Sequence, residues 1–338
     1  MTEKKIVGKL KSFNEVMYKD CFYHALIPTF RHFTGFIEPL LLNDICLEYS
    51  IENQDKVPTL IMKNASSQSY SDIFEKFGIS VKKSRISSKK MIDHTIEVLN
   101  NDGIAIIRID CFYEPLRIDS YQKYHAGHVI PIYGYDNTRN MFDILEGDFV
   151  DSVVYDAKKL EYEHVRNAYK GYIEEFKTHN HTYYEFKKVD NSVDYKKEYE
   201  VRKNNFTEYF QSNSDVFLES LKEINNYKQK LSNYFANGIN DNISTIVTSF
   251  NRMLDEVVVQ KYLFSKLFEL PSEYSVVIDE TIRLWKAIRA IVTKSMFKKS
   301  ITDKSLEMLN EMFDKQYKNE CESCLLYTSD AADEEDSV

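Results

Sequence analysis

The sequence changes character near residue 190, and this change constrains the fold more than any other feature. Before it, short β-branched and apolar runs alternate with short helical segments. After it, long amphipathic patterns indicate four helices. Their expected ranges are 195–234, 239–270, 272–296 and 303–317. The sequence therefore predicts an α+β protein, with an α/β domain over residues 1–190 and a helical bundle over residues 191–323.

Composition restricts the class of protein further. Hydrophobic residues make up 43% and charged residues 29% of the 338 residues, as in ordinary globular proteins. The net charge of −9 argues against nucleic acid as a partner. A run of about 20 apolar residues, as a membrane span requires, does not occur in the sequence. The N-terminus lacks the apolar core of a signal peptide. We expect a cytoplasmic protein that binds neither nucleic acid nor membrane.

The last fifteen residues look foreign to the rest of the chain. Residues 324–338 show no apolar period, and their first part resembles the translated read-through of a transposon-based sequencing adapter. Such segments are left out of fold reasoning. Without this segment the net charge is −4. We therefore expect residues 324–338 to be non-native and to contribute nothing to the fold.

A cysteine and a histidine occupy positions that suit nucleophilic catalysis. Cys21 follows Asp20 at the start of an apparent helix, where the helix dipole favours a thiolate. His128 opens the first strand, 129–135, of an expected antiparallel hairpin. A hairpin centred on residue 137 pairs His128 with Glu146, and one centred on residue 138 pairs it with Asp148. Either register gives a thiol, an imidazole and a carboxylate, which is the composition of a cysteine-dependent catalytic triad.

At this point the sequence resembles a known family, the N-terminal domain of the butirosin-biosynthesis protein H family. The resemblance rests on Asp110-Cys111-Phe112-Tyr113-Glu114-Pro115, Tyr121, His125, Gly127-His128 and Tyr133-Gly134-Tyr135-Asp136. It implies a papain-like fold, similar to bacteriocin-processing cysteine peptidases, with an antiparallel sheet. It also implies that an acyl group moves from a carrier-protein thioester to an amine.

The same resemblance assigns roles by position. Cys21 would be the nucleophile, His128 the base and Glu146 the acid. Relatives more commonly carry Asp followed by Pro at the acid position, whereas here Glu146 precedes Gly147. Asp148 therefore stays an alternative acid.

Other residues near these positions are candidates for lesser roles. Cys111 repeats the string Asp-Cys-Phe-Tyr and is an alternative nucleophile, although it ends a strand and lacks the help of a helix dipole. Asn14 is the nearest amide upstream of Cys21, and the Cys21 backbone N–H is an alternative oxyanion donor. Asp110 and Tyr113 are expected to orient His125 or to line the pocket.

No metal or cofactor is expected. His125 and His128 are spaced as a possible metal pair, but the segment shows no helical pattern and offers few further ligands. The widely spaced cysteines also argue against a disulfide framework or a cysteine-based zinc site.

The predicted function is a cysteine-dependent acyltransferase of natural-product biosynthesis, of the nonribosomal peptide or aminoglycoside type. Its partners would be an acyl carrier protein or peptidyl carrier domain and a small amine. Two alternatives remain. One is a cysteine peptidase or amidase that uses the same triad with water as acceptor. The other is a non-catalytic binding protein of the same fold, which the substituted acid position favours.

Overall fold

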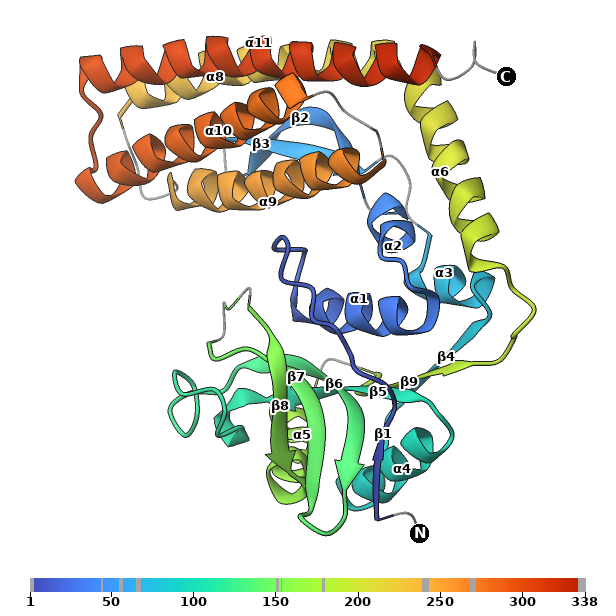
Figure 1. Ribbon diagram of the computed structural model, residues 1–338. Helices are drawn as coiled ribbons and strands as arrows, with labels where there is room; N and C mark the ends of the chain where they lie inside the picture. The colour runs from blue at the N-terminus through green and yellow to red at the C-terminus, as the bar shows by residue number, and fades with distance from the viewer. Residues whose placement is uncertain are drawn as a thin grey trace. The chain divides into compact units, whose positions relative to one another are not determined.

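The computed structural model is a mixed α+β protein with antiparallel sheets and a helical C-terminal region, as the sequence predicted. It describes residues 3–43, 45–54, 57–64, 68–149, 152, 154–177, 180–238, 243–267 and 272–333. The chain divides into two compact units, which are described separately (Figure 1). Unit 1 comprises Met1–Leu40 and Gln68–Glu200, and unit 2 comprises Leu41–Ser67 and Val201–Val338.

Unit 1 is built on a seven-stranded antiparallel sheet (Figure 1). The strands run in the order β4-β9-β5-β6-β7-β8, and β1 pairs with β6. Their bounds are β1 (Lys4–Ile6), β4 (Ile79–Ser84), β5 (Ile104–Asp110), β6 (Gly127–Asp136), β7 (Met141–Glu146), β8 (Asp156–Glu161) and β9 (Tyr183–Lys188). The central strands β5 and β6 are buried along almost their whole length, which explains their continuous apolar runs.

Helices cover this sheet. They are α1 (Cys21–Thr34), α3 (Tyr70–Lys76), α4 (Ser88–Asn100) and α5 (Tyr162–Glu175), and a 3₁₀ turn, η1 (Cys111–Tyr113), follows β5. Apolar side chains of α4 and α5, including Leu99, Val165 and Tyr169, join Ile107 and Ile130 of the sheet in one core. This core fixes the strand ends on which the candidate site is built.

The apolar run Leu40-Leu41-Leu42, which by itself would also suit a buried strand, lies in the short helix α2 (Glu38–Asn43). A triple apolar run does not distinguish a buried strand from a buried helix. Pro39 lies in the first helical turn, where its missing N–H leaves no hydrogen bond unmade.

Unit 2 combines a hairpin with helices. The hairpin consists of β2 (Cys46–Gln54) and β3 (Val57–Asn64). The helices are α7 (Ser214–Ser220), α8 (Lys222–Ala236), α9 (Ile243–Leu267), α10 (Ser272–Lys298) and α11 (Asp303–Asp333), and α6 (Tyr195–Ser212) crosses the division at residue 200. The range 195–234, predicted as one helix, is thus divided among α6, α7 and α8. Figure 1 shows the hairpin lying among these helices.

The predicted domain boundary needs a correction at the hairpin. Tyr49, Leu60 and Met62 are buried in the same core as Trp285 and Phe313 of the helices. A two-stranded hairpin cannot bury its apolar face alone, so it packs where a complementary apolar surface exists. The units are therefore discontinuous in sequence, rather than residues 1–190 followed by residues 191–323.

The predicted end of the native fold at Ser323 also differs from the structure. Helix α11 continues without a break to Asp333. Cys324, the first residue of the supposedly foreign segment, packs against the apolar core of unit 2. The expectation that this whole segment contributes nothing to the fold is therefore wrong for Cys324.

Candidate active site

The N-terminus of α1 presents Cys21. Asp20 caps the helix, and its carboxylate accepts hydrogen bonds from the backbone N–H groups of Phe22 (2.9 Å) and Tyr23 (3.2 Å). Cys21 is the first helical residue, half-buried and not in a disulfide. Its own backbone N–H donates to no residue that the structure describes. The cap thus leaves one N–H beside the sulfur, where an oxyanion donor would be needed.

His128 lies in β6 and brings an imidazole to this thiol. Its side chain is hydrogen-bonded to that of Cys21 and is almost completely buried. Its Nε2 atom lies 3.1 Å from Oε1 of Glu146, at the end of β7. The structure therefore brings together the thiol, imidazole and carboxylate that the sequence analysis singled out. Their catalytic roles stay predictions.

The pairing of β6 with β7 differs from the predicted register, in which Glu146 lies directly opposite His128. The last pair of the β6–β7 ladder is Ile132 with Ile144, beyond a register shift. Continuing this pairing by two residues places Glu146 opposite Ile130 rather than His128. The carboxylate therefore reaches His128 diagonally, which a long side chain permits. The extra methylene of Glu, compared with Asp, provides this reach.

A residue that the sequence analysis missed, Arg117, completes the centre. Its guanidinium is fully buried and contacts Oε1 of Glu146 through Nε (3.0 Å) and Nη2 (2.7 Å). Nη2 also lies 2.7 Å from Nε2 of His128, and Nη1 donates to the Phe149 carbonyl oxygen (2.6 Å). Arg117 follows the motif segment 110–115, but no periodicity or spacing marks it in the sequence.

Glu114 is a second carboxyl group that was missed as a site residue. It is fully buried, and its Oε2 lies 3.9 Å from Nε of Arg117. Among the described residues, no hydrogen-bond donor reaches either side-chain oxygen of Glu114 or Oε2 of Glu146. Burial, followed by the charge of Glu146, raises the pKa of Glu114 well above its usual range. This shift favours the neutral form of the Glu114 carboxyl group beside the charged Glu146.

The neighbouring charges set the protonation states of His128 and Glu146. Burial by itself would lower the pKa of His128, but the Glu146 carboxylate and the hydrogen bonds to Cys21 and Glu146 raise it to about 10. Burial would likewise raise the pKa of Glu146, whereas His128 and Arg117 lower it to about 2. Glu146 is therefore an anion and His128 an imidazolium at neutral pH.

Tyr155 connects this centre to α1. Its ring stacks on that of His24 (centroids 4.8 Å apart) and lies 6.4 Å from that of His128. Its hydroxyl bonds Arg117. His24 is buried, and burial lowers its pKa. Tyr155 thus links the His128 ring and Arg117 to the helix that carries Cys21.

The alternative acid lies at the surface, and the alternative nucleophile is a buried thiol next to the Arg117–Glu146 charges. Asp148 is 67% exposed and forms a surface ion pair with Lys158 (2.5 Å), so the structure places Glu146 rather than Asp148 against His128. Cys111 is buried in η1, and burial, followed by the charge of Glu114, raises the pKa of its thiol. A thiol that resists ionisation is a poor nucleophile. Asp148 is thus separate from the Cys21 centre, and Cys111 borders its charge cluster as a thiol that burial keeps from ionising.

The predicted pocket residues have mainly structural contacts. The side-chain amide of Asn14 donates to the Tyr155 carbonyl oxygen (3.1 Å) and accepts from the Tyr155 N–H (3.0 Å), so it holds the backbone at Tyr155. Buried Asp110 accepts from Nδ1 of His125 (2.6 Å), as expected of an orienting group. Tyr113 packs so closely on Gly171 of α5 that a Cβ there would lie 2.3 Å from its ring.

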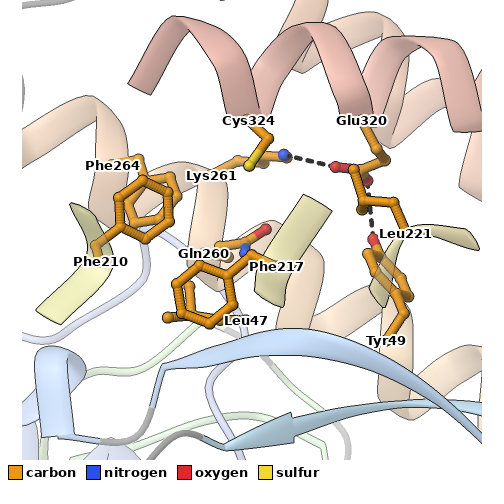
Figure 2. Close-up of a pocket in the computed structure, with 10 residues that line it drawn as sticks. All are labelled: Leu47, Tyr49, Phe210, Phe217, Leu221, Gln260, Lys261, Phe264, Glu320 and Cys324. Carbon is orange, nitrogen blue, oxygen red and sulfur yellow. Dashed lines mark hydrogen bonds and ion pairs between the residues drawn. The ribbon is translucent and has the colours of Figure 1, made fainter. Parts of the chain in front are cut away.

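Unit 2 contains the other buried charge cluster, shown in Figure 2. Glu320 accepts from Lys261 (2.9 Å) and from the Tyr49 hydroxyl (2.8 Å). The adjoining cavity has a volume of only about 30 Å³, which is the space of roughly one water molecule. The cavity is lined mostly by apolar side chains, among them Phe210, Phe217 and Phe264. This cluster is therefore part of a packed core rather than a ligand site.

Across the described part of the chain, no group of three or more His, Cys, Asp or Glu side chains is arranged to hold a metal ion. None of the helices in that part is long and apolar enough to cross a membrane.

Comparison of the chain with models of known protein families found no match, and a search of curated proteins found none either. The assignment of function therefore rests on the chemistry of the site.

Proposed function

We propose that this protein is a cysteine-dependent acyltransferase with a papain-like catalytic unit, of the kind that the resemblance to the butirosin-biosynthesis protein H family implies. The observation that carries the proposal is the contact of Cys21, at a helix N-terminus, with His128, whose ring in turn bonds Glu146. A thiol, an imidazole and an orienting carboxylate together form an activated nucleophile.

The reaction would proceed through an acyl-enzyme. The Cys21 sulfur, its proton held by His128, attacks the carbonyl carbon of a thioester. The C–S bond to the donor breaks, and His128 returns the proton to the leaving thiol. An amine then attacks the acyl-enzyme, loses a proton to His128 and releases the amide together with free Cys21. The Cys21 backbone N–H would stabilise the oxyanion in both steps.

A thioester suits this nucleophile as the acyl donor. Exchange between two thioesters is nearly isoenergetic, so acylation of Cys21 is readily reversible until an amine takes the acyl group. In the proposed role, a carrier protein or carrier domain delivers the acyl group in the cytoplasm, and a small amine of a natural-product pathway receives it. If water replaces the amine, the same centre acts as a peptidase or amidase.

One contact favours a second candidate, a non-catalytic binding protein. Nη2 of Arg117, which can only donate, lies 2.7 Å from Nε2 of His128. It competes with the bond from Nε2 to Glu146 (3.1 Å). A histidine held in this way by a guanidinium would exchange protons poorly.

The test is acylation of the intact protein by a small thioester, such as butyryl-N-acetylcysteamine, followed by intact mass. We expect one butyryl group on the parent and on Cys111→Ala, and none on Cys21→Ala. Addition of an amine should then give the amide rather than butyrate. Release of butyrate alone would support the hydrolase. A parent that stays unacylated while Cys21 accepts iodoacetamide would favour the binding protein.

A further inference from the structure

Arg108 is an arginine of unit 1 that forms no ion pair with the residues that the structure describes. It lies in β5 and is half-buried. Its Nε donates to the Tyr184 hydroxyl (3.3 Å) and its Nη1 to the Tyr172 hydroxyl (3.5 Å). Both acceptors are neutral oxygens, so the guanidinium is hydrogen-bonded but not neutralised.

Arg108 differs from Arg117 in its lack of a carboxylate partner among the described residues. Arg117 has a carboxylate at 2.7 Å, whereas Arg108 forms no ion pair with any Asp or Glu of the described residues. Its Nη2 donates to none of those residues either. A cation partly removed from water without a counter-ion has a desolvation cost that a bound anion would offset.

Arg108 also contacts the first turn of α1, which carries Cys21. Its guanidinium lies 5.6 Å from the ring centroid of Phe22, the residue that follows Cys21. The Phe22 ring packs on Tyr184 (4.9 Å), which is hydrogen-bonded to Arg108. Tyr172 is close enough to both groups that its pKa, raised mainly by burial, responds to the charges of Arg108 and Cys21. The aromatic rings thus hold the cation against the helix turn that presents the thiol.

We propose that Arg108, framed by Phe22, Tyr172 and Tyr184, binds an anionic oxygen group of the acyl donor while its carbonyl carbon is at Cys21. This inference rests on the proposed function and specifies its substrate: the donor carries a carboxylate on the acyl chain or a phosphate on the thiol arm. Nη2 supplies the charge-assisted hydrogen bond.

Matched thioesters test this subsite. Succinyl, glutaryl and adipyl N-acetylcysteamine thioesters are compared with their terminal amides, which have the same length but no charge. Butyryl-phosphopantetheine is compared with butyryl-pantetheine. We expect at least one charged donor to acylate Cys21 at least about tenfold faster than its neutral partner. Preference for the carboxylate or for the phosphate identifies the source of the charge.

Arg108→Gln should remove this preference, measured as the ratio of the rates of charged and neutral donors within the variant. Arg139→Gln, in the exposed turn between β6 and β7, is the matched control and should retain the preference. Equal rates for charged and neutral donors in the parent would overturn the proposal, as would a preference that survives in Arg108→Gln.

A second measurement separates this inference from the proposed function. Glutarate or inorganic phosphate should protect Cys21 from iodoacetamide in the parent but not in Arg108→Gln. If no thioester acylates Cys21 while this protection is observed, the acyltransferase proposal fails and the anion subsite stands. Absence of both protection and charge preference would overturn the subsite.

Discussion

Glu320 in unit 2 and Glu146 in unit 1 are both buried among donors, but the two clusters are arranged differently. In unit 2, Glu320 divides its bonds between two oxygens: Oε2 accepts from Lys261, and Oε1 from Tyr49, Trp285 and Gln316. In unit 1, one oxygen of Glu146, Oε1, takes all the contacts: the Arg117 guanidinium, the His128 ring and the Gly147 N–H. No hydrogen-bond donor of the described residues reaches its other oxygen, Oε2.

The difference separates a structural cluster from a candidate site. Glu320 and Lys261 neutralise each other, so their arrangement has little reason to change. At Glu146, the Arg117 guanidinium and the His128 ring compete for one oxygen, and the neighbouring Glu114 has a raised pKa. Donors crowded on one oxygen, beside carboxyl oxygens that no described donor reaches, leave more than one position for a proton, as acid–base chemistry requires.

The largest expected effect is on the acyl adduct, and it distinguishes Cys21 from Cys324, the thiols beside the two clusters. Cys21→Ala should abolish the acyl adduct, while Cys324→Ala should leave it unchanged. Burial raises the pKa of Cys324 to about 11, and Lys261 only partly opposes this, so its thiol stays protonated. Intact mass after thioester treatment measures both. Loss of the adduct in Cys324→Ala would break the distinction between the two clusters.

Removing the charge of Glu320 should reduce stability strongly. Glu320→Gln leaves Lys261 buried without a carboxylate, which costs about 3–5 kcal/mol. Trp285 is the only tryptophan of the chain and bonds Glu320, so its fluorescence during urea unfolding follows unit 2. Alkylation of Cys21 in the folded variant should match that of the parent. Slower alkylation would show that the unit 2 cluster also serves the site.

Glu146 should affect reactivity more than its neighbour Asp148. Glu146→Gln should slow iodoacetamide alkylation of Cys21 roughly tenfold at neutral pH, because the anion that stabilises the imidazolium is gone. Glu146→Asp should be intermediate, since the charge remains but the diagonal reach shortens. Asp148→Asn is the matched control and should change nothing, because Asp148 is exposed. Parent-like rates in Glu146→Gln would remove Glu146 from the site.

The pH dependence gives the smallest and most specific effect. The pKa of His128 is about 10 in the folded protein and about 6.5 in an unfolded chain, so its stabilisation is complete below pH ~6.5 and disappears as the pH rises towards 10. NMR of labelled histidine should show His128 protonated through pH 8. In Glu146→Gln its pKa should fall below the usual value, because burial and Arg117 then dominate. A pKa near 6.5 in the parent would contradict the buried charge network.

The sequence pointed to only part of the site. Cys21, His128 and Glu146 stood out because a helix start, a strand start and a hairpin are local patterns. Arg117 and Arg108 did not, because an isolated arginine in a chain with ordinary charge content carries no local signal. The hairpin register also left Glu146 and Asp148 equivalent. Only the diagonal reach across a shifted ladder selected Glu146.

By itself, the sequence determined that the chain is α+β, that its C-terminal part is helical, and that a thiol, an imidazole and an acid could meet. Periodicity and helix capping are short-range properties, so they can be read along the chain. The tertiary structure decided which core the β2–β3 hairpin joins, that Cys324 packs, and which arginine is neutralised. These outcomes depend on burial and on distances between residues far apart in sequence, which no local pattern contains.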